Sequence, residues 1–364
     1  MRILALEPYY GGSHKAFLDG LVSHLPYDFD LLTMPAHSWK WRMRLAAPYF
    51  AGLLQDRAER VISEYDCIFC SSLLDVATFK GMLPVRLRAL PIFCYFHENQ
   101  FAYPVQVAEE RDVHFALTNL TTALAADRLA FNSRYNLESF LCGARTLMAK
   151  VPDMRLAGFE DAVREKSTVL YPALDFSEFD AEYSCRGEGT LPVIVWNHRW
   201  EHDKNPDFFF RGLYSMAKNG ISFQLIVLGK SFRSRPAVFA EAAEKLARQT
   251  VHFGHVESRR EYCRLLRSAD VVVSTALHEF YGIAVLEAVR SGCRPLVPDR
   301  LSYQEIFPES CRYRDGDFSG QLAEALERKR LTPGEAATLT ERFSWTTQRS
   351  RYRQWFEISG ESPA

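Results

Sequence analysis

The residues of this sequence best suited to chemistry follow an apolar, strand-like run, Val271 to Ser274. The segment after it reads His278-Glu279-Phe280-Tyr281-Gly282-Ile283-Ala284-Val285-Leu286-Glu287. This spacing predicts Glu279 in a loop at the start of a helix and Glu287 two turns further along. A helix start offers unpaired N–H groups and partial positive charge, which suit a phosphate or a sugar oxygen. The two carboxylates could then bind vicinal hydroxyls of a sugar or ribose; alternatively, both are solvated on an amphipathic helix.

A second polar segment follows the strand-like run Val193 to Trp196 and contains two cations, Arg199 and Lys204. Open α/β sheets bind their ligands at the carboxyl ends of the strands. Cations at that place can neutralise a diphosphate leaving group, a task that otherwise falls to Mg²⁺. The segment therefore predicts a diphosphate site without a metal ion, and the alternative is an ordinary surface loop.

Two loops in the first half of the chain have similar potential. Gly11 and Gly12 would let the backbone approach a phosphate or sugar, although their spacing is neither a dinucleotide fingerprint nor a Walker loop. The other loop, His97-Glu98-Asn99-Gln100, follows the strand-like run Ile92 to Phe96, and His97 there could hydrogen-bond a sugar or an attacking hydroxyl. The alternatives are a plain tight turn and a structural histidine.

One strip of the sequence interleaves aromatic rings with cations, namely Trp39-Lys40-Trp41-Arg42-Met43-Arg44. Such a strip can stack unpaired bases and hold phosphates. Contact with a membrane surface and plain packing are the alternatives. A weaker basic pair, Arg259 and Arg260, is interpreted as solvated surface.

Short strand-like runs alternate with helical patterns along the chain, which is typical of parallel sheets covered by helices on both faces. The first series is Ile3 to Leu6 (expected to break at Pro8), Phe29 to Thr33, Cys67 to Cys70, Ile92 to Phe96, Leu129 to Phe131 and Thr168 to Leu170. The second series is Val193 to Trp196, Gln224 to Leu228, Val251 to Phe253, Val271 to Ser274 and Pro295 to Pro298.

Two series predict two Rossmann-like α/β domains facing a central cleft. We place the first at residues 1–175 and the second at 176–344, with residues 345–364 as a C-terminal helix that packs back on the first domain. A length of 364 residues agrees with two domains, because single cores stop growing near 250 to 300 residues.

Bulk composition excludes several classes of protein. Hydrophobic residues make up 47% and charged residues 24%, as in ordinary globular proteins. The formal net charge of -1 gives no overall attraction to a polyanion, so any nucleic-acid contact must use local patches. The eight cysteines and the histidines show no convincing metal spacing, and no apolar run approaches the length of a membrane helix. We therefore expect a cytoplasmic protein without a metal cofactor or membrane insertion.

Taken together, several of these segments resemble a known family. The Glu279/Glu287 pair, the Arg199/Lys204 loop, the Gly11-Gly12 turn and Phe343-Ser344-Trp345 are similar to the retaining GT-B glycosyltransferases over essentially the whole chain. The first domain resembles most the tRNA-queuosine α-mannosyltransferase family. The strings that carry this likeness are Tyr10-Gly11-Gly12-Ser13-His14-Lys15, Pro35-Ala36 with Trp39-Lys40-Trp41-Arg42, Tyr95-Phe96-His97-Glu98-Asn99-Gln100, Tyr103-Pro104-Val105 and Phe131-Asn132-Ser133 with Asn136-Leu137-Glu138-Ser139-Phe140-Leu141.

The resemblance implies transfer of mannose from GDP-mannose to queuosine at the wobble position of tRNA-Asp, with retention and without a metal. It implies catalytic roles for four residues: His97, Arg199, Lys204 and Glu279. It implies donor binding by a second set: Gly11, Gly12, Phe280, Tyr281, Gly282, Ile283 and Glu287. It implies acceptor or tRNA binding by a third set: His14, Trp39, Lys40, Trp41, Arg42, Arg44, Glu98, Asn99 and Gln100.

Three other functions remain open from the residues themselves. One is a glycosyltransferase that acts on a lipid carrier or a polysaccharide, with the Trp39 to Arg44 strip on a membrane surface. Another is a catalytically silent nucleotide-sugar or tRNA-binding protein, and the third is a sugar-nucleotide epimerase. The sequence leaves the oligomeric state open.

Overall fold

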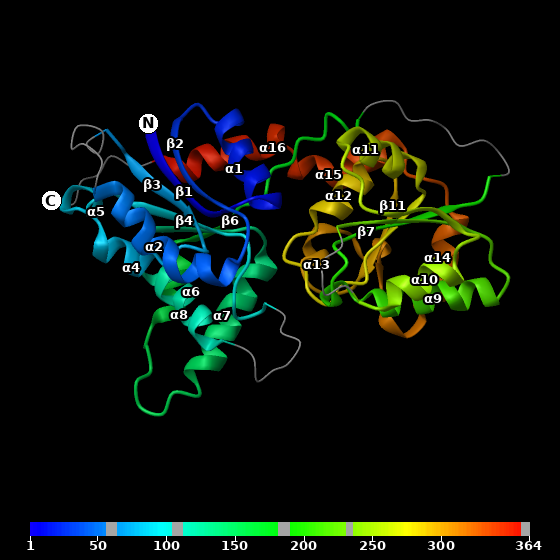
Figure 1. The fold of residues 1–364 in the computed structure, drawn as a ribbon, viewed down its shortest axis with the longest axis horizontal. Helices are drawn as coiled ribbons and strands as arrows, with labels where there is room; N and C mark the ends of the chain where they lie inside the picture. The colour runs from blue at the N-terminus through cyan, green and yellow to red at the C-terminus, as the bar shows by residue number, and fades with distance from the viewer. Residues whose placement is uncertain (56–63, 104–111, 181–189, 231–235, 358–364) are drawn as a thin grey trace. The chain divides into compact units, whose positions relative to one another are not determined.

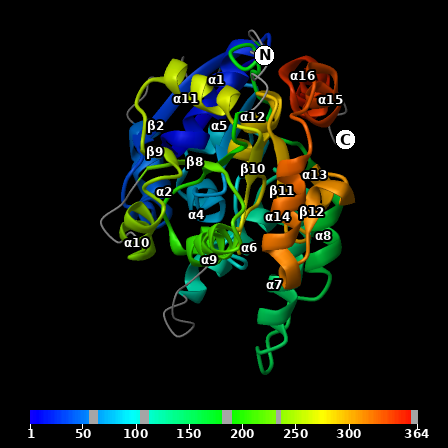
Figure 2. The same cartoon turned by 90° about the vertical axis from the view of Figure 1, so that its right-hand side faces the viewer.

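The computed structural model describes residues 1–55, 64–103, 112–180, 190–230 and 236–357. Pro104 and Val105 of one motif, and the end of the predicted C-terminal segment after residue 357, lie outside these ranges. The chain divides into two compact units, Met1–Ala173 with Gln348–Ala364, and Leu174–Thr347. These limits lie a few residues from the predicted domain boundaries. Each unit contains a parallel six-stranded sheet with helices on its faces (Figures 1 and 2).

The sheet of the first unit has the strand order β2-β1-β3-β4-β5-β6. Its strands are β1 (Arg2–Tyr10), β2 (Asp28–Pro35), β3 (Cys67–Ser71), β4 (Ile92–Phe96), β5 (Arg128–Phe131) and β6 (Ser167–Val169). All five residues of β3 and of β4 are buried, as expected for central strands covered on both faces. The six predicted strands of this series are confirmed.

The predicted break at Pro8 is wrong, because β1 continues to Tyr10. Its pairing with β3 ends at Leu6, whereas its pairing with β2 resumes at Tyr10 after a register shift. Pro8 therefore falls where β1 has lost one neighbour, and a missing N–H is tolerated at such an edge. The extension carries β1 past Tyr9 to the Gly11-Gly12 turn, while Glu7 still pairs with Thr33 of β2.

The helices of the first unit are α1 (Gly12–His24), α2 (Trp39–Gln55), α4 (Val76–Met82), α5 (Val85–Arg88), α6 (Val113–Ala125), α7 (Arg134–Met148), α8 (Phe159–Glu165) and the end of α16 (Trp345–Phe356). The Phe356 ring lies 5.9 Å from that of Phe69 and 5.8 Å from that of Phe93. The Tyr352 hydroxyl donates to the Tyr171 carbonyl at 2.9 Å. The predicted return of the last helix to the first unit is confirmed; it is drawn in red in Figure 1.

The sheet of the second unit has the strand order β12-β11-β10-β7-β8-β9. Its strands are β7 (Val193–Asn197), β8 (Gln224–Leu228), β9 (Thr250–Gly254), β10 (Val271–Val273), β11 (Arg294–Pro298) and β12 (Arg312–Tyr313). Its main helices are α9 (Pro206–Lys218), α10 (Val238–Lys245), α11 (Arg259–Ser268), α12 (Ile283–Arg290), α13 (Tyr303–Ile306), α14 (Phe318–Glu327) and α15 (Pro333–Thr340). The prediction missed β12, whose two residues are too few to give a pattern.

All strands of the second unit run parallel, so the loops that follow them meet at one edge of the sheet. The segment after β7 carries Arg199 and Lys204, and the segment after β10 carries Glu279. Because β10 is the direct neighbour of β7, the two segments must lie side by side. Within the described ranges, no helix is long and apolar enough to cross a membrane.

Candidate functional site

Lys204 is the centre of the polar cluster after β7 and β10. It ends the short 3-10 turn η2 (His202–Lys204) and is only 6% exposed. Its ammonium group donates to the His278 carbonyl at 2.7 Å and lies 3.3 Å from Glu279 Oε2 and 3.0 Å from Asp203 Oδ2. A buried cation is thus held by two carboxylates and a backbone oxygen.

Lys204 and Glu279 keep each other charged in spite of their burial. Burial by itself lowers the pKa of Lys204, but attraction to Glu279 and Asp203 outweighs it, and the net pKa is raised. Burial raises the pKa of Glu279, but the Lys204 charge and a backbone N–H outweigh it, and the net pKa is lowered. The site therefore contains a fixed positive and a fixed negative charge at neutral pH.

Two histidines border this ion pair. His198 lies with its Nε2 atom 3.3 Å from the Val273 carbonyl, and the His278 ring contacts the Phe280 ring at 4.4 Å. Burial, reinforced by the charge of Lys204, lowers the pKa of each imidazole to about 4. Both are therefore neutral at physiological pH and leave the field of Lys204 undiminished.

Arg199 lies at the exposed side of this cluster. Its guanidinium group is 3.1 Å from Glu201 Oε2, and more than half of its side chain is exposed. Burial lowers the pKa of Lys204 most, and the positive charge of Arg199 lowers it further. The predicted cation pair Arg199/Lys204 is thus brought within electrostatic range, with one member buried and the other accessible to a ligand.

The loop between Glu279 and α12 has a fixed conformation. The Tyr281 N–H lies 3.4 Å from Glu279 Oε1, and the Ser302 hydroxyl donates to the carbonyls of Glu279 and Tyr281 at 3.2 Å. Gly282 has a φ of 103° and caps α12, and a Cβ there would lie 3.0 Å from the Tyr303 ring. Only glycine suits this position, and the turn leaves the first amides of α12 without partners inside the helix.

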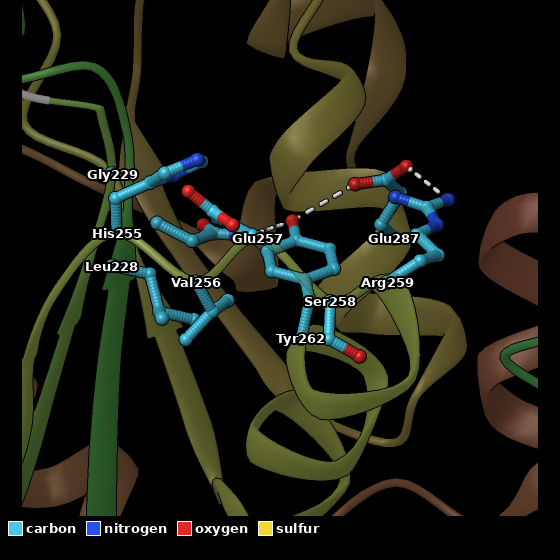
Figure 3. A pocket seen from close by; sticks show the side chains of 10 residues that line it. Leu228, Gly229, His255, Val256, Glu257, Ser258, Arg259, Tyr262 and Glu287 are labelled. Carbon is cyan, nitrogen blue, oxygen red and sulfur yellow. Dashed lines mark hydrogen bonds and ion pairs between the residues drawn. The ribbon is translucent and has the colours of Figure 1, made fainter.

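Glu287, on α12, lines a neighbouring pocket with a cavity volume of about 340 Å³ (Figure 3). This size is within the range of small-molecule sites. The pocket is formed by Asn197, Leu228, Gly229, His255, Val256, Glu257, Ser258, Arg259, Tyr262 and Glu287. It therefore lies at the carboxyl edge of β7, β8 and β9, where a parallel sheet binds its ligands.

Glu287 is held in this pocket by two donors. Arg259 donates to its Oε1 atom and the Tyr262 hydroxyl to its Oε2 atom, each at 2.9 Å, and Asn197 donates to the Tyr262 oxygen at 3.1 Å. Burial raises the pKa of Glu287, although both donors oppose the shift. The carboxylate faces the pocket beside α11 in Figure 3.

Arg259 is exposed, as interpreted, but it also has specific partners that the sequence did not show. Besides Glu287, it binds Glu178 at 3.0 Å, and its guanidinium lies 4.7 Å from the Phe179 ring centre. The lining segment His255 to Ser258 was not predicted either. This segment directly follows the predicted strand at residues 251–253. Since ligands bind at the carboxyl ends of parallel strands, its position could have identified it, as it identified Arg199.

In the first unit, the buried residues Glu7 and His14 form a second cluster with the half-buried His97. The His14 Nδ1 atom lies 3.3 Å from Glu7 Oε1, and the centres of the two imidazole rings are 4.1 Å apart. Glu7 also accepts from the Tyr9 N–H at 2.8 Å and the Ser71 hydroxyl at 3.1 Å. Glu7 was not predicted; it lies on β1 directly after the predicted strand at residues 3–6.

The two histidines have opposite protonation preferences. Burial lowers the pKa of His14, but the Glu7 carboxylate and, more weakly, Glu98 outweigh it, and the net pKa is raised. The pKa of His97 is far below its usual value because the ring is buried and the neighbouring His14 repels a second charge. His97 thus faces its surroundings as a neutral imidazole.

Among the described residues, Glu7, His14 and His97 form a group whose ligand atoms, within 4.8 Å of one another, could hold a metal ion. The two imidazole rings are tilted by 36° to one another, and Glu7 holds His14 in this group.

The remaining predicted residues of the first unit divide between surface and interior. Gly11 allows close packing, since a Cβ there would lie 2.3 Å from that of Ala36, and Gly12 has a φ of 53°. Asn99 is fully buried and donates to Asn136 Oδ1 at 2.8 Å. The Gln100 N–H donates to a buried asparagine, so these two residues hold the loop and only Glu98 and His97 are half-exposed.

The aromatic strip forms the start of α2. Trp39 is half-buried, with its ring 5.2 Å from that of Phe115, whereas the Trp41 side chain is 61% exposed. Arg44 binds Asp112. The structure thus assigns the first tryptophan to packing and leaves the second on the surface.

Comparison with known proteins identifies the class to which this fold and these sites belong. Solved structures with the same fold include the Anabaena HepE protein in complex with UDP (TM-score 0.68, 14% identity, covering 97% of this chain and 99% of that one) and sucrose-phosphate synthase from Thermosynechococcus elongatus (TM-score 0.69, 14% identity, covering 98% and 99%). Residues 186–310 match the family of group 1 glycosyl transferases. The protein is a glycosyltransferase with the GT-B fold.

The family is defined by the other half of the chain. Residues 2–174 match the N-terminal domain of tRNA-queuosine α-mannosyltransferase. A tRNA-queuosine α-mannosyltransferase of Drosophila melanogaster is 38% identical over 320 residues, which cover 85% of this chain and 83% of the relative. The chain belongs to the tRNA-queuosine α-mannosyltransferase family, as its first-unit motifs indicated.

Replacing Lys204 by Met tests the electrostatic description of the second unit. We expect a loss of about 3 to 5 kcal/mol of unfolding free energy at pH 7, because two carboxylates lose their buried partner. Without Lys204, burial raises the pKa of Glu279 above its unfolded value, so protonation on acidification favours the folded variant. The deficit relative to wild type should shrink as the pH falls toward 4.

Urea unfolding of the full chain at several pH values measures this, with the exposed Lys218 replaced by Met as the matched control. A deficit that is independent of pH would show that Glu279 does not depend on Lys204.

Replacing Glu7 by Gln tests the histidine cluster. Glu7 is the main cause that raises the pKa of His14. We therefore expect the midpoint of the His14 titration above about pH 6.5 in the wild type and below it in the variant. The raised pKa means that the Glu7–His14 pair adds stability below about pH 6.5 and loses it as the pH rises through the folded value. Histidine NMR titration measures this, and Glu165→Gln, an exposed acid of the same unit, is the control. Equal midpoints in wild type and E7Q would contradict the assignment.

Proposed function

We propose that this protein transfers mannose from GDP-mannose to the cyclopentene diol of queuosine at the wobble position of tRNA-Asp, in the cytoplasm and with retention of the anomeric configuration. The observation that carries the proposal is the family membership of the first unit, together with the intact Lys204–Glu279 cluster in the second.

In this proposal Lys204 and Arg199 bind the diphosphate. A phosphate oxygen can replace one of the carboxylates that now contact the Lys204 ammonium, and the accessible guanidinium of Arg199 can supply two further hydrogen bonds. The first amides of α12, behind the Gly282 cap, are suited to the remaining phosphate or sugar oxygens. Two cations and a helix start supply the charge that a divalent ion otherwise provides, so we propose that no metal is needed.

The pocket beside Glu287 is the proposed nucleoside site. The Glu287 carboxylate is oriented by Arg259 and Tyr262 and can accept hydrogen bonds from the two ribose hydroxyls. Glu257 is the other acid of the lining, and its carboxylate is visible in Figure 3. A carboxylate can accept from both the N1–H and the exocyclic amino group of guanine, whereas uracil offers one such donor. This chemistry favours GDP over UDP as the nucleotide.

Glu279 and His97 are proposed to act on the sugar. Glu279 is ionised and can accept from sugar hydroxyls, and the neutral His97 can exchange a hydrogen bond with the sugar or the attacking hydroxyl. A retaining glycosidase uses a nucleophilic carboxylate opposite an acid. Here the fixed charges are better suited to front-face attack, in which the leaving phosphate takes the acceptor proton and Lys204 and Arg199 stabilise the charge that develops on it.

The test is incubation of the purified protein with queuosine-containing tRNA and GDP-mannose in the presence of a metal chelator, followed by mass analysis of the nucleosides. A single hexose added to queuosine is the expected result. Transfer only after a divalent ion is restored would overturn the metal-independent mechanism. Transfer to a lipid carrier or polysaccharide, with none to tRNA, would overturn the acceptor.

The roles of the two cations predict the effect of removing each. Lys204→Ala and Arg199→Ala should each reduce turnover roughly 10² to 10³-fold, the effect of losing one preorganised donor to a developing charge. Steady-state kinetics measures this, with Lys218→Ala, an exposed cation at the end of α9, as the control. Turnover close to that of wild type in both variants would remove the proposed role.

A further inference from the structure

One face of α2 exposes large apolar side chains in a continuous row. Trp41, Leu45, Tyr49 and Leu53 follow one another at intervals of four residues, so they are neighbours along the helix surface. Their exposed fractions are 61%, 50%, 51% and 39%. We refer to these four residues as the α2 ridge. An exposed apolar row of this length on a protein surface indicates an interaction site.

The ridge is not required for packing, because α2 buries a different face. Met43, Ala46, Phe50 and Leu54 are at most 2% exposed and form that face, and α2 packs against α4. The figures show α2 on the outside of the first unit beside α4. Loss of ridge side chains should therefore leave the fold intact.

The surroundings of the ridge are positively charged. The helices α2, α4 and α5 contain no aspartate or glutamate. Their cations are Lys40, Arg42, Arg44, Lys80, Arg86 and Arg88. Arg44 and Lys80 are paired with Asp112 and Asp127, and the other four have no ion pair with a described acid. In a chain with a net charge of -1, three adjoining helices free of acids favour a polyanionic partner.

We infer that the α2 ridge and its flanking cations form the surface on which the anticodon arm of the acceptor tRNA docks, with unpaired bases stacked on Trp41 and Tyr49. This inference rests on the proposed function and adds to it the place where the RNA is held. Phosphates of the same segment lie against Lys40 and Arg42. Leu45 and Leu53 contact the apolar faces of the bases and sugars.

The dimensions of the ridge suit a single strand. Eight residues separate Trp41 from Tyr49, which is about 12 Å along a helix axis. Nucleotides of one strand succeed one another at about 3.4 Å, so the two rings can hold bases a few nucleotides apart. Aromatic rings with neighbouring cations are the usual means of binding unpaired bases. A membrane surface would be contacted by the apolar row as well, but it offers no ring-sized partner for stacking.

The test compares the double variant Trp41→Ala/Tyr49→Ala with the matched control Met154→Ala/Leu156→Ala, which removes two exposed apolar side chains of the same unit outside these helices. Binding of queuosine-containing tRNA without donor, and transfer at varied tRNA concentration, are measured for both. The ridge variant should bind tRNA more weakly, with a KM for tRNA raised tenfold or more, since each base stack contributes about this factor. Its kcat and its affinity for GDP-mannose should stay within about twofold of wild type.

A charge variant separates the phosphate contact from stacking. Lys40→Glu should weaken tRNA binding and flatten its dependence on salt concentration, whereas Lys150→Glu, on the same unit, should do neither. Unchanged tRNA affinity in the ridge variant overturns the inference. A second outcome would also overturn the inference. In it, the wild type but not the ridge variant binds anionic phospholipid vesicles, and the two proteins have equal affinity for tRNA. The ridge would then be a membrane-contact surface. Wild-type protein that binds tRNA through the ridge but transfers no mannose would contradict the proposed function alone.

Discussion

The ammonium group of Lys204 is buried between Glu279 and Asp203, and the organisation of the second unit depends on this interaction. A cation with so little exposure is stable in a folded protein only when charges and hydrogen bonds replace its water. Here two carboxylates and the His278 carbonyl do so, and they come from the segments after two neighbouring strands. The ion pair therefore fixes how the loops after β7 and β10 meet, and these loops form the site that we propose for the sugar diphosphate.

The two buried clusters of the molecule obey the same electrostatic rule. In each, a carboxylate raises the pKa of a buried basic group, and the pKa of a neighbouring imidazole is lowered by its burial and, second, by repulsion from that basic group. Glu279 does this for Lys204, beside His198 and His278; Glu7 does it for His14, beside His97. A neutral imidazole can both donate and accept a hydrogen bond, which suits contact with hydroxyl groups at physiological pH.

Most of the architecture could be predicted from the sequence, because buried parallel strands are near-continuous apolar runs that end at polar loops. The same pattern located Arg199, Lys204, Glu279 and Glu287, which follow or adjoin such strands. Several features escaped prediction, and three of them show why. The chain continues as a strand through Pro8, because pairing with β3 has already ended there and a missing N–H costs little. Arg259 is distant in sequence from Glu287, so its pairing is visible only in the fold. The burial of Asn99 depends on Asn136, a contact that no local pattern reveals.

The central claim is that Lys204 binds the donor diphosphate without a metal ion. It is tested most directly by calorimetric titration of GDP-mannose into wild-type protein and the Lys204→Met variant, both in the presence of a chelator. The account predicts binding to the wild type and an affinity at least tenfold weaker for the variant, since a charge-assisted hydrogen bond contributes about 1.5 to 3 kcal/mol. Equal affinities, or wild-type binding that requires a divalent ion, would contradict it.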